Sequence, residues 1–256
     1  MGVMDLGLTD RVYIVTAASA GLGRATAEQL VAEGAQVVLA ARRGDVLAEA
    51  VRELGPQHAT SVTVDLADPS SAGTCCAAAL NTFGRLDGAM ISVGGPLAGT
   101  VLGTSEEDWT DAFASVFLPA LRISKAVLAH GTSDNISLAW VLSTSVKSPI
   151  GGLAISNGLR PGLAMTVKQL ADEIGPDGHR AVGLMPGRIE TERVKHLDSL
   201  ADDPQSARAS AEAGIPMRRY GNPAEFGRIA TFVLSPAASY LTGAVIPVDG
   251  GALRAL

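Results

Sequence analysis

Short apolar runs rich in Val, Ile and Leu recur along the chain and predict seven buried strands. These runs begin at Val12, Val37, Ser61, Gly88, Leu138, Ala181 and Ala244. Between them, apolar residues recur at helical spacing over residues 24–33, 46–54, 70–83, 106–129, 153–174 and 223–234. Continuous apolar strands are buried on both faces, and strands that alternate with helices are joined by right-handed crossovers. The pattern therefore predicts an α/β fold with a doubly wound, parallel, seven-stranded sheet.

The whole chain, residues 1–256, fits a single domain. Its length and its 47% hydrophobic content suffice for one large core, and no internal repeat or linker interrupts the alternation. One segment differs from the rest, because residues 192–214 are polar and alanine-rich and contain Asp-Asp-Pro. We expect a mobile helical insertion there, near the carboxyl ends of the strands, where such folds bind their ligands.

Charge and cysteine use narrow the class of partner. The net charge of −6 and the absence of a basic block argue against a nucleic-acid partner and favour a small molecule. No segment is expected to reach the roughly 18 apolar residues that cross a bilayer. The adjacent Cys75 and Cys76 fit a reduced helix, and the histidines at positions 58, 130, 179 and 196 are too scattered to predict a metal site. These features predict a cytoplasmic protein with no metal and no membrane span.

A glycine-rich turn follows the first strand and leads into the first helix. From Thr16 to Gly23 it reads Thr-Ala-Ala-Ser-Ala-Gly-Leu-Gly. Gly21 and Gly23 let the backbone approach a pyrophosphate, and the helix amino terminus offers free N–H groups and the positive end of a dipole. Glycine also occurs in tight turns for purely conformational reasons, so glycine alone is weak evidence for a dinucleotide site. The position of the turn between a strand and a helix is what favours that interpretation. The turn predicts a dinucleotide site of the Rossmann type.

The end of the second strand indicates which dinucleotide binds. An NAD site places an acidic residue there to accept hydrogen bonds from the ribose hydroxyls, but this chain has Arg42 and Arg43. A guanidinium matches a 2'-phosphate in charge and geometry, so the pair predicts NADP(H), with Arg42 as the first candidate. The alternative is that both arginines are simply solvent-exposed side chains at the end of a strand and bind no ligand.

Several segments, in order along the chain, resemble the short-chain dehydrogenase/reductase family. The first turn is similar to that family's Thr-Gly-x-x-x-Gly-x-Gly turn, with Ala17 in place of the first glycine. Further similar segments are Asp65-Leu66, Ser92-Val-Gly-Gly95, Pro186-Gly-Arg-Ile-Glu-Thr191 and Val248-Asp-Gly-Gly251. The resemblance covers essentially the whole chain and implies one Rossmann-type domain that binds NADP(H).

The resemblance also implies which residues surround the cofactor. Asp65 and Leu66 correspond to the family's adenine contacts, and Gly94, Gly187, Ile189 and Thr191 to its nicotinamide and ribose surroundings. With the first turn, the arginine pair and the proline before Gly187, the predicted cofactor set is Thr16, Ser19, Gly21, Leu22, Gly23, Arg42, Arg43, Asp65, Leu66, Gly94, Pro186, Gly187, Ile189 and Thr191.

The catalytic positions of the family are altered in this chain. The family's tyrosine, the lysine four residues later and the serine thirteen residues earlier correspond to Ser156, Arg160 and Ser143. Its supporting asparagine falls near Val116. The chain's tyrosines, at positions 13, 220 and 240, belong to other elements. A guanidinium with a pKa above about 12 and a serine hydroxyl do not replace an acidic tyrosine.

Ser143, Ser156 and Arg160 are therefore the candidate catalytic residues. Together they can stabilise an oxyanion, while solvent or an acidic group of the substrate supplies the proton. The alternative for Ser156 is a residue that merely fills space in its helix.

The predicted function is hydride transfer between NADP(H) and a carbonyl or alcohol substrate, with a layout that resembles the family's 3-oxoacyl reductases. Because the acid is missing, two alternatives stay open: a catalytically silent NADP(H)-binding protein, and non-redox chemistry on the same fold. The resemblance also implies a homotetramer or homodimer. Its interfaces are expected at the Pro-Val-Asp-Gly-Gly end and at the long helices over residues 106–129 and 153–174.

Overall fold

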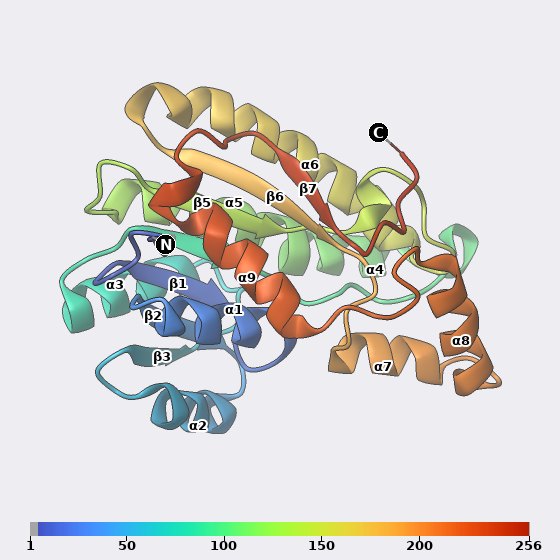
Figure 1. Cartoon of the computed structure of the whole chain (residues 1–256). Helices are drawn as coiled ribbons and strands as arrows, with labels where there is room; N and C mark the ends of the chain where they lie inside the picture. Colours follow the sequence, from blue (N-terminus) through green and yellow to red (C-terminus); the bar gives the residue numbers. More distant parts are fainter. Residues whose placement is uncertain (1–4, 256) are drawn as a thin grey trace.

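A single parallel sheet forms the centre of the computed structural model, which describes residues 5–255 (Figure 1). Its seven strands follow the order β3-β2-β1-β4-β5-β6-β7, and every neighbouring pair is parallel. The predicted fold class is confirmed. The strands are β1 Val12–Thr16, β2 Gln36–Ala41, β3 Ala59–Thr63, β4 Gly88–Ile91, β5 Ser137–Val141, β6 Arg180–Pro186 and β7 Val245–Val248.

Helices cover both faces of the sheet. One face packs against α3 (Ser71–Phe83), α5 (Leu118–His130) and α6 (Ala154–Ile174). The other packs against α1 (Gly21–Ala32), α2 (Gly44–Leu54) and α9 (Pro223–Leu234). The remaining helices are α4 (Glu106–Ala112), α7 (Glu192–Ser199) and α8 (Pro204–Gly214).

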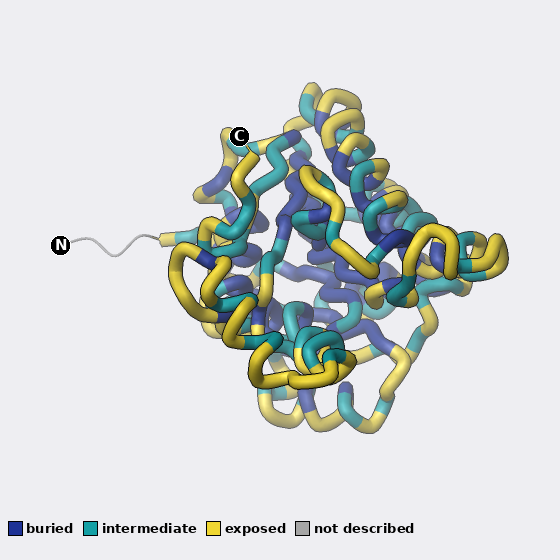
Figure 2. Tube along the Cα trace, turned by 90° about the vertical axis from the view of Figure 1, so that its right-hand side faces the viewer, coloured by how far each residue is buried: buried dark blue, intermediate teal, exposed yellow. Residues whose placement is uncertain are grey.

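Side-chain alternation along the strands explains why two cores form. In β1, Val12 and Ile14 belong to the cluster beneath α3, α5 and α6, whereas Tyr13 and Val15 belong to the cluster beneath α1, α2 and α9. Successive strand residues point to opposite faces, so a strand buried on both sides must be apolar throughout. Figure 2 shows the buried strands at the centre and exposed segments around them.

The segment predicted as one helix over residues 106–129 consists of three parts. After α4, residues Phe113–Phe117 form a π-helical turn, and the chain then continues directly into α5. A π turn within a helix often marks a functional site. Here it contains Val116, which is 2% exposed.

We expected no segment that is long and apolar enough to cross a bilayer. By length and composition alone, one helical segment is, so this expectation is wrong. The 25 residues Glu106–His130 meet both criteria, with a mean hydropathy of 1.5 over their most apolar window. Such a helix is weak evidence for a membrane span, because the core helix of a soluble protein has the same properties. Ile123 and Val127 of this segment pack into the core against the sheet.

The predicted insertion over residues 192–214 consists of the two helices α7 and α8, which lie beyond the end of the sheet at the lower right of Figure 1. An Arg188–Asp198 ion pair holds α7 next to the segment that follows β6. Arg208 of α8 lies 2.8 Å from Glu190 and stacks 4.7 Å above the ring of Tyr220. The helical character that we predicted is confirmed.

Candidate cofactor and active site

The first turn is built around a link between the ends of β1 and β4. Thr16 is fully buried; its hydroxyl donates to the carbonyl oxygen of Ser92 at 2.5 Å and accepts from the Ser92 N–H at 2.8 Å. Ala17 follows with φ at +50°, in the left-handed region that favours glycine. Gly23 packs so closely that an added Cβ would lie 2.6 Å from the carbonyl oxygen of Ala17. The turn therefore requires Gly23 but tolerates Ala17 under strain.

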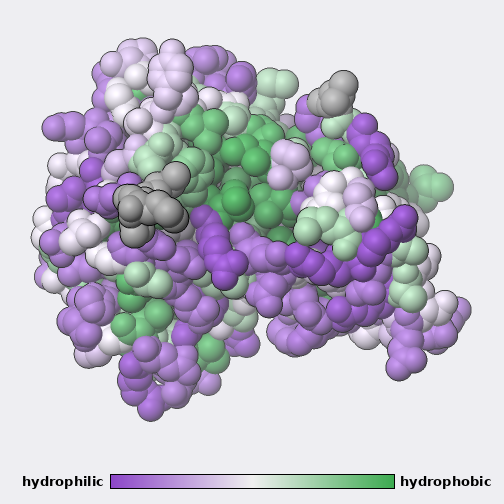
Figure 3. All heavy atoms as spheres, viewed as in Figure 1, coloured by the Kyte–Doolittle hydropathy of each residue, from purple (hydrophilic) through white to green (hydrophobic). Residues whose placement is uncertain are grey.

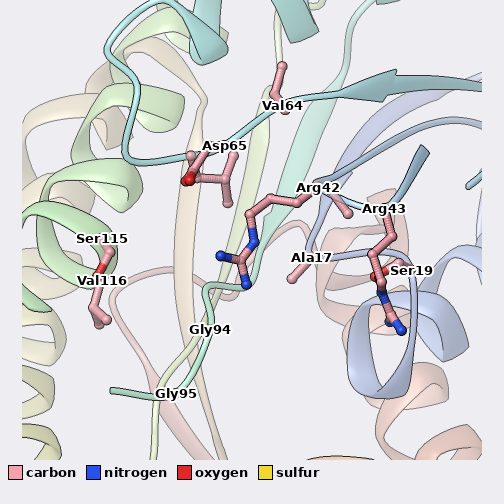
Figure 4. A pocket seen from close by; sticks show the side chains of 12 residues that line it. Ala17, Ser19, Arg42, Arg43, Val64, Asp65, Gly94, Gly95, Ser115 and Val116 are labelled. Atoms are coloured by element: carbon pink, nitrogen blue, oxygen red, sulfur yellow. The ribbon is translucent and has the colours of Figure 1, made fainter. Parts of the chain in front are cut away.

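A cavity of about 450 Å³ opens beside this turn, at the carboxyl ends of β1, β2 and β4 (Figure 4). Its size suits a small ligand or part of a dinucleotide. It brings together six residues of the predicted cofactor set: Ser19, Arg42, Arg43, Asp65, Leu66 and Gly94. Thr16, Gly21, Leu22, Gly23, Pro186, Gly187, Ile189 and Thr191 of that set do not line it.

Arg42 and Arg43 take different directions in this cavity. Figure 4 shows Arg42 extending across the opening towards Gly94, whereas Arg43 turns towards the first turn. The Arg43 guanidinium donates from Nη2 and Nε to the Ser19 hydroxyl, at 3.0 and 3.3 Å. Neither arginine forms an ion pair within residues 5–255. Both charges are therefore available to a phosphate, and these residues fit NADP(H) better than NAD(H).

The segment after β6 lies next to the first turn. The methyl group of Thr191 would lie 3.3 Å from a Cβ built on Gly21. The Thr191 hydroxyl accepts from the Val194 N–H and caps α7, and Ile189 is 4% exposed. Gly187 packs against Asp249, so that an added Cβ would lie 2.6 Å from the Asp249 Cβ. The segment after β6 thus meets the first turn, although Gly187, Ile189 and Thr191 do not line the cavity.

Ser156, at the start of α6, lies against Ser145. Their hydroxyl oxygens are 3.3 Å apart, and Ser156 is 7% exposed. Ser143, which the thirteen-residue spacing selects, instead accepts the N–H of Ser145 at 3.1 Å and caps the 3-10 helix Thr144–Val146. Sequence reasoning missed Ser145. The available signal was the Ser143-Thr-Ser145 pattern, since a short helical turn carries the second serine towards α6.

Arg160 lies one helical turn after Ser156 and is 5% exposed. Its Nη1 donates to the carbonyl oxygen of Val141 at 2.6 Å, at the end of β5. Within the described chain its Nε has no hydrogen-bond partner. Burial, and to a smaller extent the charge of Arg193, lowers the pKa of Arg160 to about 10, below the value above 12 that we expected. The side chain therefore remains cationic at neutral pH.

The region where the family's asparagine is expected is apolar in this chain. Val116 belongs to the core beneath α5 and also lines the cavity. Trp109 of α4 packs on Gly158 of α6, where an added Cβ would lie 2.5 Å from its ring. Gly158 thus allows α6 to approach α4 closely, whereas the cavity lining includes neither Ser156 nor Arg160.

Comparison with known proteins identifies the class. A family model described as enoyl-(acyl carrier protein) reductase matches residues 16–252. The chain belongs to the short-chain dehydrogenase/reductase family.

Three relatives illustrate the similarity. The chain is 33% identical to an uncharacterized oxidoreductase of Mycobacterium tuberculosis, over 95% of this chain and 92% of that protein. It is 28% identical to the 3-oxoacyl-acyl-carrier-protein reductase of Vibrio harveyi, over 96% of this chain and 98% of that protein. The crystal structure of L-sorbose reductase from Gluconobacter frateurii, complexed with NADPH and L-sorbose, superposes with a TM-score of 0.92 at 28% identity. That match covers 99% of this chain and all of the other.

Proposed function

We propose that this protein is an NADPH-dependent oxidoreductase that reduces a carbonyl compound, or oxidises the corresponding alcohol. Membership of the family supports NAD(P)-dependent carbonyl chemistry, and the relatives that act on 3-oxoacyl groups and on L-sorbose support a carbonyl substrate. The observation that carries the choice of NADPH is that Arg42 and Arg43 both line the cavity and have no carboxylate partner in the described chain. A site for NAD would place an acidic group there.

The catalytic centre in this proposal uses two hydroxyls and one cation. Ser145 and Ser156 donate hydrogen bonds to the carbonyl oxygen, and Arg160 stabilises the negative charge that develops on it. We assign to Ser145 the role that the sequence spacing gave to Ser143, because the Ser143 hydroxyl caps the adjacent turn.

The proton must come from elsewhere. When bound, NADPH would supply the hydride to the carbonyl carbon. The hydroxyl of Tyr13 donates to the carbonyl oxygen of Leu234 in the core, Tyr220 stacks beneath Arg208, and Tyr240 is exposed beyond α9. None of these tyrosines lies with Ser156, so water is the proton source that fits this centre. Loss of a poised acid lowers the rate by about 10²–10⁴ without abolishing hydride transfer.

The rival function is a catalytically silent protein that binds NADP(H). The observation that favours it is the serine and arginine at the positions of the family's tyrosine and lysine. The test measures NADPH binding by fluorescence, and NADPH oxidation by absorbance against a panel of ketones, 3-oxoacyl thioesters and sugars. Binding together with turnover of any carbonyl supports the oxidoreductase, and binding without turnover supports the rival. Non-redox chemistry would show as substrate loss without NADPH oxidation.

We further propose that the protein assembles as a homotetramer, or failing that a dimer, in the cytoplasm. Figure 3 shows a hydrophobic area around β7 and the neighbouring part of α9. Ile229 of α9, which is 38% exposed, lines a cavity together with Ile246 and Val248, and β7 is an edge strand of the sheet. Exposed apolar patches and open strand edges are commonly covered by a second copy of the chain.

A further inference from the structure

Arg160 is a buried cation without a counter-ion. It is 5% exposed, its Nε meets no acceptor, and no carboxylate among residues 5–255 pairs with it. Proteins bury arginine where it is paired, because an unpaired buried charge loses its hydration without compensation. The single hydrogen bond from Nη1 to Val141 leaves the Nε side of the guanidinium unused. That side is one of the two edges through which arginine binds a carboxylate with two parallel hydrogen bonds.

A second unpaired arginine lies beyond the end of β4, the strand that pairs with β5. Arg193 of α7 reaches across Gly95, where an added Cβ would lie 2.7 Å from its Nε, and its Nη2 donates to the carbonyl oxygen of Pro96 at 2.8 Å. Its charge acts on Arg160 and disfavours the protonated form of that residue. The two guanidiniums therefore lie at neighbouring strand ends, Arg160 at the end of β5 and Arg193 beyond the end of β4.

The carboxylates nearest to Arg193 in the sequence have other partners. Glu192 accepts from Lys195 at 3.1 Å, and Glu190 accepts from Arg208 at 2.8 Å. Across the part of the chain that the structure describes, no acidic side chain is paired with Arg193 either. Two guanidiniums at neighbouring strand ends thus have no carboxylate partner among residues 5–255, and this arrangement favours an anionic ligand.

We propose that Arg160 and Arg193 bind a carboxylate of the substrate, so that the protein acts on oxo acids rather than on neutral ketones. This inference rests on the proposed function. Ser156 precedes Arg160 by one helical turn and lies with Ser145, so the carboxylate sits beside the carbonyl that the two hydroxyls hold. The phosphates of the cofactor belong to the other end of the site, at the start of α1 and at Arg42 and Arg43. The exposed Arg193 receives the anion and the buried Arg160 fixes its orientation.

Calorimetric titration of the full chain, with and without NADP⁺, tests the proposal directly. The probes are malonate, which is not reduced, and malonamide, its neutral counterpart. Malonate should bind at least about tenfold more tightly than malonamide, as expected for charge-assisted hydrogen bonds. Arg193→Gln should remove most of that preference and leave the affinity for NADPH unchanged. Lys195→Gln is the matched control, because it removes a positive charge from the same helix at an exposed position that pairs with Glu192; it should leave the preference intact.

Arg160 needs two variants, since an uncharged side chain in its place can unfold the protein. Arg160→Gln is used only if its melting temperature stays near that of the natural chain. Arg160→Lys keeps the charge but loses the planar edge, and it should weaken malonate binding without abolishing it. In kinetics, the KM for 3-oxobutanoate should rise in Arg193→Gln, while the KM for the neutral 3-oxobutanamide stays constant.

Two results overturn the inference and leave the proposed function intact. One is reduction of carbonyl compounds with no preference for malonate over malonamide. The other is a selective loss of NADPH affinity in Arg193→Gln, which would assign the two arginines to a phosphate of the cofactor. Conversely, if the natural chain binds malonate tightly but oxidises no NADPH, the anion site is supported and the proposed oxidoreductase function is rejected.

Discussion

The hydroxyl oxygens of Ser145 and Ser156 lie 3.3 Å apart, although the residues come from different elements and are separated by eleven positions. The 3-10 helix after β5 carries one and the first turn of α6 carries the other. Both elements are fixed by packing against the sheet, so the pair is in place before any ligand binds. Preorganised donors of this kind stabilise a developing oxyanion without reorganisation during the reaction.

Replacement of Ser145 should therefore reduce turnover more than replacement of Ser143. Loss of one oxyanion donor lowers kcat by about 10²–10³ in sites of this type. We expect Ser145→Ala to approach that loss at unchanged NADPH affinity. Ser143→Ala removes only a cap on the short turn, so its main effect should be a lower melting temperature, with little change in kcat. Steady-state kinetics and thermal melting of the two variants decide the assignment, and a larger kcat loss in Ser143→Ala would restore the sequence-based choice.

Much of the fold could be predicted because the sheet is buried on both faces. Alternation of apolar runs with helical segments gave seven parallel strands, since few other arrangements bury such runs. The π turn at Phe113–Phe117 was not predicted, because one extra residue in a helical turn barely changes the apolar periodicity. The bounds of the segment Glu106–His130 were predicted to within one residue, but its mean hydropathy is higher than we expected.

The site was harder to predict than the fold. The arginines after β2 were selected as candidates because charge at one strand end is visible in the sequence, and both line the cavity. Ser145 was missed because a fixed spacing from Ser156 assumes a loop of constant length between β5 and α6. The burial of Arg160 against the end of β5 and the contact of Arg193 with Gly95 and Pro96 depend on tertiary packing, which no local pattern encodes. Sequence spacing thus predicted which elements carry the candidate site, and tertiary packing decided which of its side chains meet.

Arg42→Ala should weaken NADPH binding by about 1.5–3 kcal/mol and leave NADH binding nearly unchanged, because only NADPH carries the 2'-phosphate. Arg43→Ala should have a similar selective effect, since Arg43 and the Ser19 hydroxyl are hydrogen bonded at the same cavity. Fluorescence titration with both cofactors measures the losses. Arg52→Ala is the control, as Arg52 is an exposed residue of α2 paired with Glu49. Equal losses for NADPH and NADH would contradict the assignment of the arginines to the phosphate.

Ala17→Gly should stabilise the protein. Ala17 has φ at +50°, and the left-handed conformation costs a residue with a Cβ about 1–2 kcal/mol. Glycine loses about 0.5–1 kcal/mol through its larger entropy in the unfolded chain, so we expect a net gain of about 0.5–1 kcal/mol. Urea denaturation measures it. The matched control is Ala18→Gly, at the next position along the chain. Ala18 is fully buried and has a negative φ, so this variant should be less stable than the natural chain. A loss of stability in Ala17→Gly would show that the turn is not strained.

Ile229→Asp should disrupt self-association. The residue is 38% exposed on α9, beside the hydrophobic area around β7, and a carboxylate there would have to be buried in the interface between copies. Light scattering at micromolar concentration should give the mass of a tetramer or dimer for the natural chain and a smaller mass for the variant. Leu102→Asp places the same charge at an almost fully exposed apolar residue before α4 and should not change the mass. A monomeric natural chain would refute the proposed assembly.

The double substitution Ser156→Tyr and Arg160→Lys should raise turnover on neutral ketones. It would install an acid next to Ser145 and an ammonium that lowers the pKa of that acid, and the gain is bounded by the roughly 10²–10⁴ that acid-base catalysis provides. Each single change should do less, because tyrosine without the ammonium keeps a pKa near about 10 and lysine beside serine has no acid to tune. Turnover of oxo acids should improve less than turnover of ketones, since the lysine loses the planar edge proposed to bind the carboxylate. The measurement is kcat on a ketone and on an oxo acid for all four chains, with melting temperature and NADPH affinity as controls for folding. A folded double variant that binds NADPH but is slower than the natural chain on ketones would mean that Ser156 and Arg160 serve a different chemistry.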